Sequence, residues 1–180
     1  MDPRLAEYLG QCTKVGPETE AVWGNGTLPL CIQPYLTNHP PPLEFVNSVR
    51  SLVFRGKEIL VLRNRDGLHI VPGGRRETGE SLEQTVEREV LEESGWRIAR
   101  LEMIGLLSFR HLGAKPPDYP FLYPNFLNLI YAADVVEFAP ELKLPDEYEI
   151  QAGFRPVEEV LSLNLLGRVF LEAALRLRIT

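Results

Sequence analysis

The sequence predicts a mixed α/β (α+β) domain in which β-hairpins build the sheet. Four strand-favouring runs support this class, at residues 49–54, 58–63, 100–109 and 125–137. The first two flank Arg55-Gly56-Lys57, which is a hairpin signal. Because helices do not alternate regularly with these strands, the pattern does not favour a Rossmann fold.

The first 42 residues differ in character from the rest. Residues 3–10 predict a short helix that Pro3 opens and Gly10 closes. Residues 27–37 favour an extended conformation, but Pro29 and Pro34 restrict them to an edge strand or a loop. The run Pro40-Pro41-Pro42 is a stiff boundary. We therefore expect an N-terminal extension over residues 1–42 and the main domain over 43–180.

The main domain continues with a short strand at 68–71, a helix at 81–94 and C-terminal helices at 157–161 and 164–178. Ser81-Leu82-Glu83-Gln84 has the form of a capping box, and Gly95 ends the helix that it begins. The loop 111–124, between the last two long strands, is rich in proline and aromatic residues.

Composition excludes several classes of protein. With 180 residues, 44% of them apolar, the chain can form one well-packed core. A net charge of −6 argues against a protein that coats nucleic acid or a basic membrane-surface helix. The sequence shows no signal peptide or membrane span, and Cys12 and Cys31 have no metal-like spacing. We expect a cytoplasmic protein that binds neither membrane nor nucleic acid.

The most informative feature is a cluster of carboxylates on the helix at 81–94. Glu89, Glu92 and Glu93 fall within an arc of roughly 100° on a helix, where like charges repel. Such a cluster favours a cation, and carboxylate oxygens suit Mg²⁺ or Mn²⁺, which also bind substrate phosphates. Gly73 and Gly74 before the helix allow the backbone to approach a metal or a phosphate closely. Taken alone, however, such a run of glutamates in most cases marks only a solvated acidic helix face.

The surrounding pattern decides between these interpretations. Gly74-x5-Glu80-x7-Arg88-Glu89-Val90-x-Glu92-Glu93-x-Gly95-Trp96 has a chance probability on the order of 10⁻⁶ at this composition. It resembles the signature box of the Nudix hydrolases at every specified position. The order of elements over roughly 45–180 resembles that family too. The resemblance implies the Nudix fold, in which helices sandwich a mixed, curved sheet and the box forms a loop–helix–loop.

The resemblance also implies a reaction, the divalent-metal-dependent hydrolysis of a nucleoside diphosphate linked to another group. Glu89, Glu92 and Glu93 would bind Mg²⁺ (or Mn²⁺), with the backbone of Gly73 and Gly74 beside it. Arg88 would orient the glutamates. Glu80 and Gly95 would support the box.

A carboxylate must accept a proton from the attacking water. Glu89 is one candidate for this base. Glu149 is the preferred candidate from a later loop, and Glu147 is the second.

Substrate choice falls outside the box. Four residues that follow the third long strand, before the fourth begins, are candidates for binding the base or the phosphates: Arg110, His111, Tyr119 and Phe121. Aromatic residues of this kind also pack often against the sheet.

Three functions remain open: a pyrophosphohydrolase acting on a nucleotide or nucleotide-sugar, a non-catalytic nucleotide-sensing module, and an isomerase or RNA-end processor. The complete set of carboxylates favours the first. A homodimer is an open alternative to a monomer.

Overall fold

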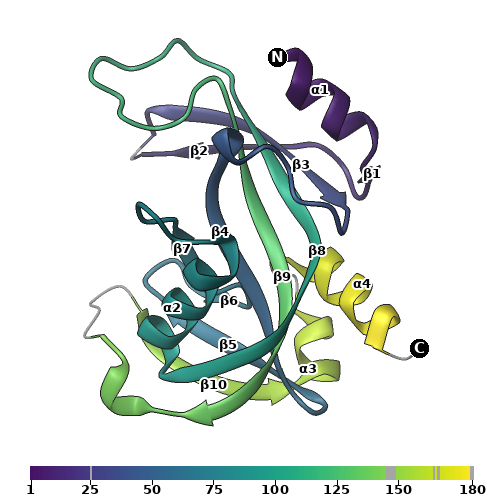
Figure 1. Ribbon diagram of the computed structural model, residues 1–180, viewed down its shortest axis with the longest axis vertical. Helices are drawn as coiled ribbons and strands as arrows, with labels where there is room; N and C mark the ends of the chain where they lie inside the picture. Colours follow the sequence, from purple (N-terminus) through teal and green to yellow (C-terminus); the bar gives the residue numbers. More distant parts are fainter. Residues whose placement is uncertain (25, 145–148, 164, 166, 179–180) are drawn as a thin grey trace.

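The computed structural model describes residues 1–24, 26–144, 149–163, 165 and 167–178, with the backbone alone at 149 and 150. Figure 1 shows a long, curved sheet with helices on both faces. The helices are α1 (Pro3–Gly10), α2 (Leu82–Ser94), α3 (Val157–Ser162) and α4 (Arg168–Arg178), with short 3-10 turns at Leu43–Phe45 and Pro140–Leu142. The strands are β1 (Thr13–Lys14), β2 (Thr19–Trp23), β3 (Leu28–Leu36), β4 (Val46–Arg55), β5 (Glu58–Asn64), β6 (Gly67–His69), β7 (Gly73–Arg75), β8 (Trp96–His111), β9 (Asn125–Phe138) and β10 (Glu149–Pro156).

The strands of the described residues form one mixed sheet in the order β1-β3-β8-β9-β4-β5-β10. β4 runs parallel to β9, and the other pairs are antiparallel. Two strands share the free edge of β4: β7 pairs with residues 48–50 and β5 pairs with residues 54–55. The sheet therefore divides along β4. The short strand β7, which carries the glycine pair, lies at this division.

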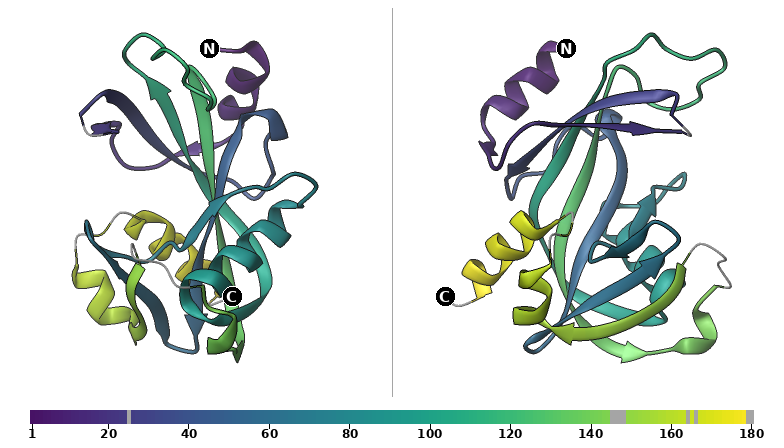
Figure 2. Two further views of the ribbon diagram at one scale, coloured as in Figure 1. Left: turned by 90° about the vertical axis from the view of Figure 1, so that its left-hand side faces the viewer. Right: turned by 180° about the vertical axis from the view of Figure 1, so that it is seen from behind.

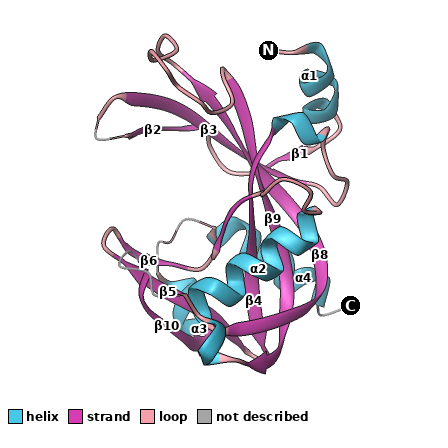
Figure 3. Ribbon diagram, turned by 60° about the vertical axis from the view of Figure 1, so that its left-hand side comes forward, coloured by secondary structure: helices cyan, strands magenta, loops and turns pink. Residues whose placement is uncertain are grey.

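Two apolar layers hold the helices to the sheet. Leucines of α1 and the Leu82, Val86 and Val90 stripe of α2 lie in the layer on one face. Phe170 and Leu171 of α4 lie, with residues of α3, in the layer on the other face. Figures 2 and 3 show α2 on one side of β4 and β9, with α3 and α4 on the other. The predicted sandwich of a mixed, curved sheet between helices is confirmed.

Helix α2 has the ends that the sequence predicts. The Ser81 side chain accepts a hydrogen bond from the Gln84 N–H, and the Gln84 side chain accepts one from the Ser81 N–H. Gly95 follows the last turn at φ 76°, a left-handed conformation that glycine adopts without steric cost. These caps fix where α2 begins and ends, and thus where its glutamates lie.

The predicted edge position of β3 is wrong. This strand lies inside the sheet, between β8 on one side and β1 and β2 on the other. Each proline has a partner on one side of β3 only: Pro29 is paired with Val22 of β2, and Pro34 is paired with Leu107 of β8. Pro29 precedes Leu30, the first residue paired with β8, and Pro34 falls between the residues that pair with β2 and with β1. A proline is tolerated there because its missing N–H removes no ladder bond.

The other expected elements are present with small shifts. The strand expected at 68–71 spans Gly67–His69, and α4 begins at Arg168. Cys12 and Cys31 are free thiols. Among the described residues, no helix has the length and apolar character needed to cross a membrane.

Candidate active site

The glycine strand β7 lies directly against helix α2. The Gly73 N–H donates a hydrogen bond to Oε2 of Glu93 at 3.0 Å. A Cβ atom on Gly74 would lie 2.5 Å from Cδ of Glu89, and closer still to its Oε1. Such a distance is inside van der Waals contact, so only glycine at position 74 lets the Glu89 carboxylate rest on the strand. The structure thus brings Gly73, Gly74, Glu89 and Glu93 together.

Arg88 connects the rest of the box. Its Nε donates to Oε1 of Glu80 at 2.6 Å, and its Nη1 donates to Oε1 of Glu89 at 3.0 Å and to Oε2 of Glu92 at 3.1 Å. Its Nη2 donates to the backbone oxygen of Arg75 at 3.0 Å. One guanidinium therefore joins three carboxylates to strand β7, and the orienting role of Arg88 stays a prediction.

The two carboxylates nearest Arg88 have opposite pKa shifts. The bond from Arg88, helped by the Glu77 N–H, lowers the pKa of Glu80 to about 2. Burial raises the pKa of Glu89 above its ordinary value, although Arg88 and Arg50 oppose the shift. Glu80 is thus held as a stable anion. The charged form of Glu89 is penalised by its surroundings.

This difference predicts how acid affects the fold. Because the folded pKa of Glu80 is depressed, its contribution to stability is complete above pH 4.5, the ordinary pKa, and is lost as the pH falls toward 2. The excess free energy of unfolding of the wild type over Glu80→Gln should therefore be constant above about pH 5 and shrink below it. Urea unfolding at several pH values measures this excess. Glu87→Gln, on the exposed side of α2, is the control; an excess that does not change between pH 6 and 3 would contradict the assignment.

The donor set of the box suits a hard divalent cation. Glu89, Glu92 and Glu93 offer only carboxylate oxygens, the ligands that Mg²⁺ and Mn²⁺ prefer. As they stand, the His, Cys, Asp and Glu side chains of the described residues form no group of three that could hold a metal ion. Glu89 and Glu92 contact Arg88 here, and Glu93 contacts Gly73. Binding a cation at this site would require these carboxylates to reorient.

Arg110 and His111 follow each other on β8 and therefore point to opposite faces of the sheet. Arg110 is half exposed, with its Nη2 4.0 Å from Oε1 of Glu18. His111 is buried, packs on Phe126 and lies 3.5 Å, Nε2 to Oη, from Tyr119. Burial lowers its pKa. That Arg110 and His111 contact the substrate stays a prediction.

Tyr119 and Phe121 extend this aromatic packing outward. The Tyr119 ring meets both His111 and Phe121 edge-on, with centroids 5.3 Å apart in each pair. Phe121 is the exposed end of the series, and the guanidinium carbon of Arg75 lies 3.8 Å from its ring centroid. The loop between β8 and β9, at the top of Figure 1, is therefore joined to the glycine strand by Arg75.

The loop candidates for the base cannot be placed. Glu147 lies outside the described residues, as does the side chain of Glu149, whose backbone pairs with Asn64.

The sequence analysis did not select Arg50 as a site residue. Arg50 lies on β4, where it pairs with Gly73 of β7, and its Nη1 donates a hydrogen bond to the backbone oxygen of Val71. A signal was present in the sequence, because Arg50 is the one charged residue in the strand predicted at 49–54.

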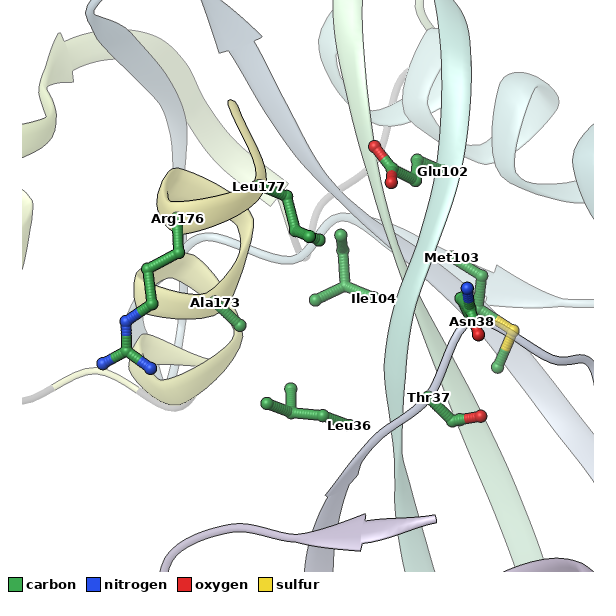
Figure 4. A pocket seen from close by; sticks show the side chains of 9 residues that line it. All are labelled: Leu36, Thr37, Asn38, Glu102, Met103, Ile104, Ala173, Arg176 and Leu177. Carbon is green, nitrogen blue, oxygen red and sulfur yellow. The ribbon is translucent and has the colours of Figure 1, made fainter. Parts of the chain in front are cut away.

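A separate hollow of about 360 Å³ lies between β8 and α4. Figure 4 shows its mainly apolar lining, which includes Leu36, Ile104 and Ala173, with the Arg176 guanidinium pointing away. No box residue lines it. We therefore place the candidate site at β7 and α2.

A mixed sheet that divides around a glycine strand, with a helix presenting three glutamates beside it, defines the class of Nudix-fold proteins. Comparison with known families agrees: the sequence model of the family described as NUDIX domain matches residues 44–174. The chain belongs to this family of Nudix hydrolases, as the box predicts.

Two solved structures share the fold. A mutant of the pyrophosphohydrolase BsRppH of Bacillus subtilis has a TM-score of 0.51 and 23% identity, covering 76% of this chain and 77% of that one. A MutT NUDIX hydrolase from Burkholderia pseudomallei has a TM-score of 0.53 and 17% identity, covering 71% and 96%.

Curated relatives carry the name NAD-capped RNA hydrolase NudC. The protein from Mannheimia succiniciproducens is 26% identical over 95% of this chain and 61% of its own length. That from Enterobacter sp. (strain 638) is 51% identical over 45% of this chain and 29% of its own length. The chain thus spans less than two thirds of the relatives that it matches.

Proposed function

We propose that this protein hydrolyses a nucleoside diphosphate linked to another group, with a divalent cation as cofactor. The supporting observation is the close approach of α2 to β7, where the Glu93 carboxylate accepts the Gly73 N–H and Glu89 occupies the space beside Gly74. A sensing module needs no such set of carboxylates. The names of the relatives add NAD and NAD-capped RNA to the substrates to be tested.

The residues of the site would divide the reaction into metal binding, positioning and proton transfer. Glu89, Glu92 and Glu93 would hold Mg²⁺, which neutralises the diphosphate and makes bound water more acidic. Arg88 keeps Glu89 and Glu92 in register with β7, because it contacts both carboxylates and the Arg75 carbonyl at once. Water attacks phosphorus in line with the departing phosphate oxygen, and Glu89 or Glu149 accepts its proton.

Arg50 is the cation that sequence reasoning did not select. It lies beside Gly73, and its charge makes a small contribution that opposes the rise of the Glu89 pKa. An arginine in this position can stabilise the negative charge that develops on the diphosphate. We assign it to substrate binding at the glycine strand.

The test is a panel of substrates with the purified protein and Mg²⁺: NAD, a short NAD-capped RNA, ADP-ribose, nucleotide sugars, dinucleoside polyphosphates and nucleoside triphosphates. Cleavage within a diphosphate that EDTA abolishes is the expected result, and Glu93→Gln should lower it at least about a hundredfold. The glutamine amide oxygen can still accept the Gly73 N–H, so the fold should survive. Wild-type activity in Glu93→Gln would refute the assigned site. If no substrate is cleaved while a nucleotide raises the melting temperature, the sensing module replaces this proposal.

A further inference from the structure

The exposed face of Phe121 is covered by a cation from the glycine strand. The Arg75 guanidinium carbon lies 3.8 Å from the ring centroid, and Tyr119 supports the ring from its edge. Phe121 is 38% exposed even with Arg75 in place. A flat, accessible aromatic ring that has an edge-on aromatic neighbour and is covered by a long, flexible side chain is a surface on which a planar group can stack.

Backbone hydrogen bonds and strand pairing hold the backbone of Arg75, whereas its guanidinium is held by its contact with the Phe121 ring. The Arg75 carbonyl accepts a hydrogen bond from Nη2 of Arg88, and the residue pairs with Ser48 on β4. Among the described residues, no carboxylate forms an ion pair with the Arg75 side chain. Its neighbour Gly74 touches Glu89, so the guanidinium starts from the strand that borders the proposed diphosphate site.

The two possible partners of Phe121 differ in strength. A cation over an exposed ring is held weakly, whereas stacking of a nucleobase on an aromatic ring is stronger and tolerates any base. A guanidinium released from the ring would gain charge-assisted, paired hydrogen bonds with phosphate oxygens. The exchange is therefore favourable for a ligand that carries both a base and a diphosphate.

We propose that Arg75 and Phe121 form an exchange pair: the base of a nucleoside diphosphate displaces Arg75 from the Phe121 ring, and Arg75 turns to the phosphates. This inference rests on the proposed function and extends it, because it assigns Arg75 to substrate binding and makes the site selective for compounds that join a base to a diphosphate. Arg75 also competes for the Phe121 ring with planar compounds that carry no phosphate group to which its guanidinium could bind.

Three probes separate the two halves of the exchange: adenosine carries only the base, inorganic pyrophosphate carries only the phosphates, and ADP carries both. Binding is measured by NMR titration with EDTA present, so that phosphate binding reports on the protein's own cations. Arg75→Ala should bind adenosine about two- to fivefold more tightly, because the ring loses its competitor. The same variant should bind pyrophosphate about tenfold more weakly.

Variants of the ring complete the test. Phe121→Leu should bind adenosine at least about fivefold more weakly and pyrophosphate no more weakly, while Phe121→Tyr keeps both affinities. Arg76→Ala removes an equal charge from the neighbouring exposed position and should change neither. The proposal is overturned if Arg75→Ala fails to tighten adenosine binding, or if Arg76→Ala has the same effects. These titrations need no turnover, so they stand or fall separately from the substrate panel.

Discussion

Gly74→Ala is expected to lower kcat/KM by about a hundredfold while the protein remains folded. An added Cβ would lie 2.5 Å from Cδ of Glu89, so the carboxylate must leave its place beside β7. Displacement of a reacting or metal-binding group by about 1 Å is enough for a loss of this size. The fold should survive because the Glu89 carboxylate ends a flexible side chain and can move without disturbing the backbone.

The measurement is steady-state hydrolysis of the best panel substrate, together with the urea midpoint of the same preparation. Gly153→Ala is a matched control, because Gly153 is also a strand glycine and its added Cβ would meet nothing within 4 Å. Activity of Gly74→Ala within about twofold of the wild type, at an unchanged midpoint, would contradict the arrangement of Glu89 that the proposed function requires.

The local structure of the box could be predicted from the sequence, because the signals that determine it are local. The Ser81 cap, the Gly95 stop and the 3.6-residue period fix where α2 begins, where it ends and which face carries Glu89 and Glu93. Once those are set, the position of Arg88 near Glu92 follows from helix geometry, and the structure has that contact.

Features that depend on which segments meet in space were not predictable in the same way. The internal position of β3 was not predicted, because the proline rule applies to a strand that is paired along its whole length on both sides. In β3, Pro29 has a partner only in β2 and Pro34 has a partner only in β8. The contact of Arg75 with Phe121 joins a strand to an irregular loop 46 residues later, which no periodicity links. The charge of Arg50 within its strand was visible in the sequence, but its place beside the glycine strand depends on the pairing of β4 with β7.

Gly105→Ala is expected to lower the free energy of unfolding by about 3 kcal/mol or more. Gly105 lies on β8 opposite Leu36 of β3, and an added Cβ would collide with the Tyr35 backbone oxygen and lie 2.9 Å from Cε1 of the buried Phe170. The β3 backbone at Tyr35 and the packed side chain of Phe170 cannot both move away from the new Cβ atom without a loss of pairing or packing. The variant must therefore separate β3 from β8 or loosen α4.

Residues 1–42 are predicted from their sequence to be an N-terminal extension, and this variant also tests whether they unfold independently of the main domain. Leu5 and Leu9 of α1 lie in the same apolar layer as Val86 and Val90 of α2, so loss of β3 should expose the core beneath the box helix. We therefore expect a single urea transition at a lower midpoint, with faster amide exchange in both β3 and α2. Gly113→Ala is the control, because its Cβ would make only an ordinary contact with Pro29. Faster exchange confined to residues 1–42, at an unchanged midpoint, would instead show an independent extension and would mean that the box helix is stable without it.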